Sequence, residues 1–166
     1  MMGPRGEEDL LPDLIRYLTT TLDRAHEVLG SIGVDQWDLP TPCAEWSVRQ
    51  LAPLPVDDHG AERFRAEEDA LIAAWQQHPP DPGAPLAGQT ISELTIHTWD
   101  LARETGQDPG IASEPAEFAA GWMGKALKPE YRGSAFGAER SAMPDAPACD
   151  RLVAISGRDP AWSPGR

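Results

Sequence analysis

Glu93 and His97 are the two side chains in this sequence whose types and spacing best fit a chemical role. They are four residues apart, so on a helix both side chains would lie on one face. A carboxylate and an imidazole at this spacing can offer two ligands to a metal ion from one rigid element. The same spacing also arises by chance on amphipathic helices, as a solvated ion pair or a packed histidine. Spacing alone leaves both interpretations open.

The other histidines give weaker signals. His59 follows two aspartates, so this stretch offers metal ligands, although a solvated acidic helix start explains it equally well. His26 lies beside the apolar stripe of the first predicted helix and is expected to be half exposed. His78 precedes two prolines and is expected on a surface loop.

Two cysteines are too few for a disulfide framework. Cys43 and Cys149 are far apart in sequence, and neither adjoins a histidine, so both are interpreted as structural or incidental thiols. The sequence contains no glycine-rich phosphate loop, nucleophile elbow or zinc-finger spacing. A chain with free thiols is expected in a reducing cytoplasm.

Helices must position these side chains, because apolar residues recur at spacings of three and four and no strand alternation is evident. A capping box of Ser47 and Gln50 predicts the start of a short helix. Six helices are predicted. The first three are 12–29, which ends at Gly30, a short helix after Ser47, and 60–77. The other three are a helix that is capped by Thr90 or Ser92 and ends at Gly106, a helix over 115–127, and a last helix that is capped by Asp145 and ends at Gly157. The segment 128–144 is predicted to be a loop. The fold class expected is all-α, most simply an up-and-down bundle with long connections.

The length and charge of the chain limit its partners. Its 166 residues fit a single domain, 1–166, with a helical bundle over about 10–157 and a polar, frayed tail over 158–166. The 27 acidic and 14 basic side chains give a net charge of −13, which argues against nucleic-acid and anionic-membrane partners. No apolar run approaches the roughly 20 residues needed to span a bilayer, and the N-terminus lacks an apolar signal core.

Three stretches together resemble a known family. They are Thr-Pro-Cys-Ala-Glu-Trp-Ser-Val-Arg at 41–49, the helix 93–107 with Glu93, His97, Trp99 and Asp100, and 145–152 running into 156–160. The chain resembles, from about residue 10 to 162, the actinobacterial metal-binding family related to mycothiol-dependent maleylpyruvate isomerase. That family belongs to the DinB-like superfamily, and the third stretch resembles its small stand-alone members. The resemblance implies a DinB-like up-and-down four-helix bundle with an extra C-terminal helix and long loops.

The same resemblance implies a divalent-metal site, with zinc as the expected ion and Glu93 and His97 as two ligands. The family's third ligand is a histidine, and the matching position here is Leu54, between two prolines. The middle of the chain, about 55–90, also looks shorter than in the family. His59 is the possible replacement ligand, although on an ideal helix it would lie about 140° around the axis from Leu54.

The function implied is a thiol-dependent transferase or isomerase, with mycothiol as co-substrate and a small electrophile as its partner. Glu93 and His97 would hold the metal, Trp99 would support them by packing, and Asp100 by a hydrogen bond. The loss of the third histidine points to an impaired site. It therefore leaves open the alternative of a non-catalytic bundle or degenerate paralogue that acts as a binding protein. A monomer and a homodimer both fit the sequence.

Overall fold

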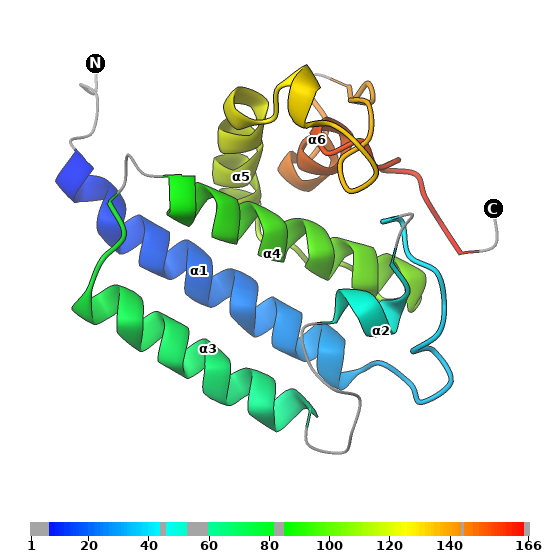
Figure 1. Cartoon of the computed structure of the whole chain (residues 1–166), viewed down its shortest axis with the longest axis horizontal. Helices are drawn as coiled ribbons and strands as arrows, with labels where there is room; N and C mark the ends of the chain where they lie inside the picture. The colour runs from blue at the N-terminus through cyan, green and yellow to red at the C-terminus, as the bar shows by residue number, and fades with distance from the viewer. Residues whose placement is uncertain (1–6, 44–45, 53–59, 82–84, 144, 165–166) are drawn as a thin grey trace.

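The computed structural model describes residues 7–43, 46–52, 60–81, 85–143 and 145–164 (Figure 1). Within these residues the chain is helical, as predicted, and the extended backbone pairing consists of an isolated bridge between Pro40 and Ser47. The helices are α1 (Glu7–Gly30), α2 (Val48–Leu51), α3 (Gly60–Gln77), α4 (Pro85–Glu104), α5 (Ser113–Ala126), the 3-10 helix η1 (Pro129–Tyr131) and α6 (Ala148–Ile155). No described helix has the length and apolar character needed to cross a membrane.

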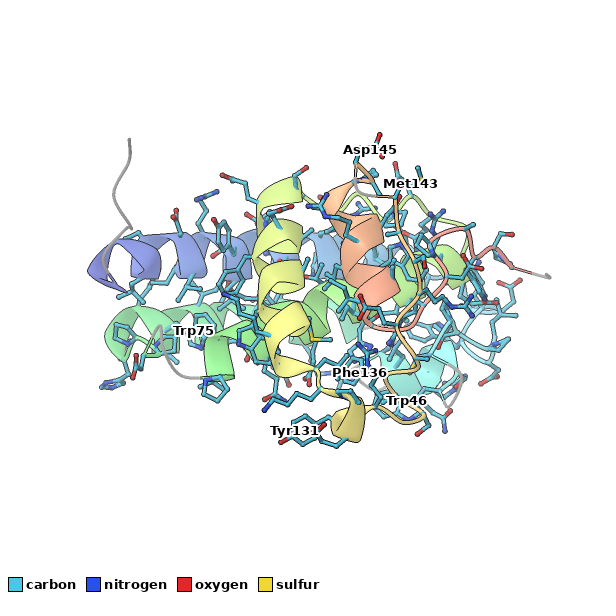
Figure 2. The ribbon with its side chains drawn as sticks, turned by 90° about the horizontal axis from the view of Figure 1, so that it is seen from above. Trp46, Trp75, Tyr131, Phe136, Met143 and Asp145 are labelled. Carbon is cyan, nitrogen blue, oxygen red and sulfur yellow. The ribbon has the colours of Figure 1, made fainter. Side chains whose placement is uncertain are left out.

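Three long helices lie side by side, with α1 between α3 and α4 (Figure 1). The chain runs along α3 in the direction opposite to α1, and along α4 in the same direction as α1. Helix α5 crosses them steeply and packs against α4 on one side and α6 on the other (Figures 1 and 2). Helix α4 is therefore covered from several directions, which makes it the central element of the fold.

The main core forms where α1 meets α3 and α4. The apolar residues of α1 recur every three or four positions, so they share one face of the helix. This stripe, Leu14, Leu18, Leu22 and Ala25, is buried together with Phe64 and Trp75 of α3 and Ala87 and Ile91 of α4. The periodicity in the sequence thus predicted the core face of α1 correctly.

Glycines end two helices in the left-handed conformation. Gly106 has φ = 72° and Gly157 has φ = 89°, which favour glycine because it has no Cβ. In each case the next residue donates its N–H back across the last turn, from Gln107 to the carbonyl of Ala102 and from Arg158 to that of Val153. Both predicted stops are confirmed.

The predicted starts of three helices were wrong. Helix α1 begins at Glu7, so Pro12 lies inside it, because the apolar stripe offsets the one hydrogen bond that a proline removes. Helix α4 begins at Pro85, a residue favoured in the first turn, rather than at a threonine or serine cap. Helix α6 begins at Ala148 after an extended Pro147, and Asp145 does not cap it.

The predicted frayed tail is also wrong over its first residues. Arg158 is only 5% exposed because it pairs with the fully buried Asp100 of α4. Arg103 donates to the carbonyl of Pro160, which holds the next part of the tail against the same helix. A polar segment is therefore expected to be exposed only where the interior offers no charged or hydrogen-bonding partner to its side chains.

Candidate functional site

Over residues 91–102, helix α4 exposes only a narrow strip, and this strip contains the candidate site. Between residues 91 and 102, every side chain is buried except those of Glu93, Leu94 and His97, which are half-buried. The helix presents Glu93 and His97 on one face because they are four residues apart. The structure therefore keeps the predicted pair on the accessible side of a helical segment, 91–102, that is otherwise buried.

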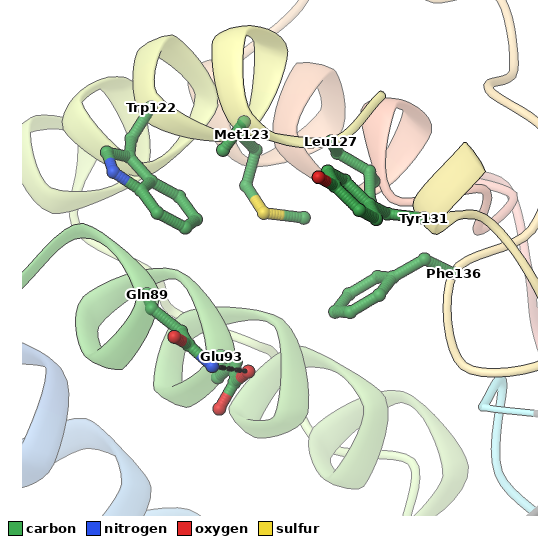
Figure 3. Close-up of a pocket in the computed structure, with 8 residues that line it drawn as sticks. Gln89, Glu93, Trp122, Met123, Leu127, Tyr131 and Phe136 are labelled. Carbon is green, nitrogen blue, oxygen red and sulfur yellow. Dashed lines mark hydrogen bonds between the residues drawn. The ribbon is translucent and has the colours of Figure 1, made fainter. Parts of the chain in front are cut away.

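Glu93 lies at the edge of a pocket between α4, α5 and the segment 129–136 (Figure 3). Its Oε1 accepts a hydrogen bond of 3.0 Å from Nε2 of Gln89, one turn earlier on α4. The pocket holds about 300 Å³, and its remaining walls are Trp122, Met123, Ala126, Leu127, Tyr131 and Phe136. No local pattern in the sequence indicates this pocket, because its walls come from three separate segments.

His97 is oriented by neighbours on two sides. Its Nδ1 lies 3.4 Å from Oδ2 of Asp100, one turn further along α4. The indole of Trp46 lies beside the ring, with 6.0 Å between the ring centroids. A carboxylate beside Nδ1 favours the tautomer with its proton there, which leaves Nε2 to accept a proton or bind a metal.

Asp100 is itself fixed by a buried ion pair. Nε of Arg158 donates to Oδ1 at 3.1 Å, and Nη2 donates to Oδ2 at 2.9 Å. Nη1 of Arg158 also donates to the carbonyls of Ala135 and Ser156. This pair joins α4 to the segment after α6, and it provides the helix-to-loop hydrogen bond expected of Asp100. Trp99, expected to support the site by packing, is 1% exposed.

The donor set supplies two of the three protein ligands of a catalytic zinc site. An imidazole nitrogen and a carboxylate oxygen are both common zinc ligands, but catalytic zinc sites normally have three protein ligands. Among the residues that the structure describes, no three His, Cys, Asp or Glu side chains are grouped to hold an ion. His59 and the Leu54 position lie outside the described residues. Glu93 and His97 would supply two ligands from α4, and a catalytic zinc ion held there would need a third protein ligand or water.

A buried carboxylate that sequence reasoning missed lies between α1 and α3. The side chain of Glu68 is 1% exposed, with Nε of Arg65 at 3.4 Å and Nδ1 of His26 at 3.9 Å from its Oε2. Burial raises the pKa of Glu68 to about 7, against the opposing effect of Arg65. The signal was present in the sequence, since Glu68 follows Phe64 by four residues on the apolar face of its helix.

The remaining histidines and thiols behave as expected. His26 is half-buried and His78 is exposed at the end of α3. Cys43 is buried and Cys149 is half-buried. Burial and the nearby Asp150 raise the pKa of Cys149 to about 12, so this thiol stays protonated at neutral pH and is a poor nucleophile.

Gly88 determines where the indole of Trp122 can lie in the pocket wall. A Cβ added at Gly88 would come within 2.2 Å of that ring. We therefore expect Gly88→Ala to displace the indole and to lower the free energy of unfolding by about 1–3 kcal/mol through overpacking. Urea unfolding measures the cost. Gly121→Ala, which meets nothing within 4 Å, is the control and should not destabilise the fold. Equal stability of the two variants would contradict this packing.

Comparison with known proteins adds relatives but no activity. No protein-family model matches the chain, and no solved structure matches it. Two uncharacterized proteins of Mycobacterium tuberculosis, Rv0738 of strain H37Rv and MT0763 of strain CDC 1551, are each 28% identical to it over an alignment 169 positions long. Each match covers 79% of this chain and 90% of the relative. The geometry of the site therefore carries the functional argument.

Proposed function

We propose that this protein binds a divalent metal ion, zinc in the first instance, through Glu93 and His97. One observation carries the proposal: Nδ1 of His97 faces the buried carboxylate of Asp100, on the same open strip of α4 as Glu93. Metal-binding histidines usually donate their second ring N–H to a carboxylate, which fixes the ring and makes the other nitrogen a better ligand.

The remaining ligands come from outside this pair. We propose His59 or water as the third ligand in place of the histidine that the family resemblance puts at position 54. The same resemblance supports a DinB-like four-helix bundle as the ancestry of the fold. Two protein ligands bind zinc less tightly than three, so we expect an affinity below that of structural zinc sites.

A bound divalent ion would supply one chemistry here, the stabilisation of a thiolate or hydroxide at neutral pH. Around it, Asp100 would hold the proton on Nδ1 of His97, while Arg158 holds the carboxylate of Asp100 in place. The pocket beside Glu93 would receive the apolar part of a substrate. We propose a thiol-dependent transferase or isomerase, with mycothiol as the thiol that the family resemblance implies.

Leu54 favours a second candidate function. A chain with leucine at the third ligand position has lost a metal ligand. A helical protein can keep its fold after it has lost its catalytic activity. In that case the protein would act as a binding protein, and neither Glu93 nor His97 would contribute to its activity.

Metal titration separates the two functions. Zinc added to chelator-treated, untagged protein is expected to bind at about one ion per chain, and His97→Ala should abolish this binding while helix content stays unchanged. His78→Ala removes an exposed histidine and serves as the matched control. Isothermal titration and metal analysis give the stoichiometry. Zinc binding that survives His97→Ala, or no binding near micromolar zinc, would contradict the proposed site.

A further inference from the structure

The walls of the pocket beside Glu93 are mainly aromatic and apolar. Trp122, Tyr131 and Phe136 contribute aromatic rings from α5 and the segment after it, and Met123 adds a thioether (Figure 3). Of the described lining residues, Glu93 is the only acidic one, and none is a lysine, arginine or histidine. Apolar walls with one polar end are typical of sites that orient a small organic molecule.

We propose that this pocket binds a compact aromatic molecule whose single polar group lies at the Glu93 end. We further propose that the preferred charge on that group changes from positive to negative when a divalent ion is bound. The second statement rests on the proposed metal site, whereas the first depends only on the pocket. The ligand class is therefore an aryl compound with a short charged arm.

The size and the rings of the pocket argue for a compact aromatic body. A volume of about 300 Å³ is at the lower end of small-molecule sites, so a single ring with a short arm fits better than a larger ligand. Aromatic side chains favour stacked or edge-to-face contact with another ring. Tyr131 is 65% exposed, so its side chain remains largely open to solvent.

The charge preference follows from Glu93. Its Oε1 is held by Gln89, which fixes the carboxylate at the polar end of the pocket. Without a metal, a cationic head group is attracted both by this carboxylate and by the faces of the aromatic rings. A divalent ion held by Glu93 and His97 would reverse the local charge, so an anionic head group would then be preferred.

Three fluorinated probes of similar size test the proposal: 4-fluorobenzylamine, 4-fluorobenzyl alcohol and 4-fluorobenzoate. Fluorine NMR titration against the intact protein gives each dissociation constant, first with a chelator present and then with saturating zinc. Without zinc, the amine is expected to bind about fivefold more tightly than the benzoate. With zinc, the benzoate is expected to bind more tightly than the amine.

A pair of variants on α5 locates the binding. Ala126 lines the pocket, so Ala126→Leu should fill part of it and weaken all three probes about fivefold. Gly124→Leu adds the same side chain at an exposed position with open space around it, and it should leave probe binding unchanged. Circular dichroism confirms that both variants fold.

The possible failures are distinguishable. If no probe binds, or if Ala126→Leu and Gly124→Leu behave alike, the pocket is not the binding site and the inference is wrong. If the amine remains the preferred probe with zinc present, the pocket stands and the change of preference is wrong, whereas failure of the metal site itself is shown separately by the zinc titration with His97→Ala.

Discussion

Replacing Arg158 with alanine is expected to lower the free energy of unfolding by about 3–5 kcal/mol. The loss has a single main cause, since the carboxylate of Asp100 is fully buried and would remain without its two charge-assisted hydrogen bonds. The carbonyls of Ala135 and Ser156 would also lose a donor. Urea unfolding followed by circular dichroism measures the change.

An exposed ion pair is the control for this variant. Arg49 donates to Asp38 at 3.0 Å, but their side chains are 47% and 84% exposed. Arg49→Ala should therefore cost less than about 1 kcal/mol. If Arg158→Ala cost no more than Arg49→Ala, Asp100 would not be held as the structure shows, and its support of His97 would fail with it.

Changing Glu68 to glutamine is expected to stabilise the protein above neutral pH. Burial raises the pKa of Glu68 to about 7, so the folded chain holds this proton more tightly than the unfolded chain does. The unfolded chain then binds fewer protons between pH ~4.5 and ~7, and stability falls as pH rises through that window. Glutamine cannot ionise, so the variant should escape this loss.

The expected gain is about 2 kcal/mol at pH 8 and close to zero at pH 4. Arg65, 3.4 Å from the carboxylate, favours its ionised form and so moderates the gain, whereas Asp23 and Asp69 oppose its ionisation and add to the gain; His26 also faces the carboxylate, at 3.9 Å. Urea unfolding at the two pH values measures the difference. Glu67→Gln, on the exposed side of α3, should show no such pH-dependent gain. A Glu68→Gln variant that is less stable than wild type at pH 8 would show that the ionised form is the favoured one.

Local patterns predicted which segments are helical, although not where three of the helices begin. Helix α3 spans 60–77 as expected, and the box of Ser47 and Gln50 forms, with Gln50 Oε1 accepting the N–H of Ser47 at 3.0 Å. These features depend on residues a few positions apart, so the sequence displays them directly. The ion pair of Arg158 could not be predicted in this way, because its partner Asp100 is 58 residues away and no local pattern links the two residues.

The candidate site was predicted only in part, for the same reason. The spacing of Glu93 and His97 on one helix indicated a shared face, and the structure places both on the open strip of α4. The pocket beside Glu93 required α5 to cross α4, which helical periodicity does not encode. Glu68 was overlooked because glutamate is rarely buried, although its position on the apolar face of α3 marked it.

The most direct test of the proposed function is an anomalous difference map from crystals soaked in zinc. We predict a peak bonded to Nε2 of His97 and a carboxylate oxygen of Glu93, at the ~2.0–2.2 Å typical of zinc ligands, and absent from His97→Ala crystals. A zinc peak elsewhere, such as between His26 and Glu68, or no peak at saturating zinc, would contradict the assignment of this site.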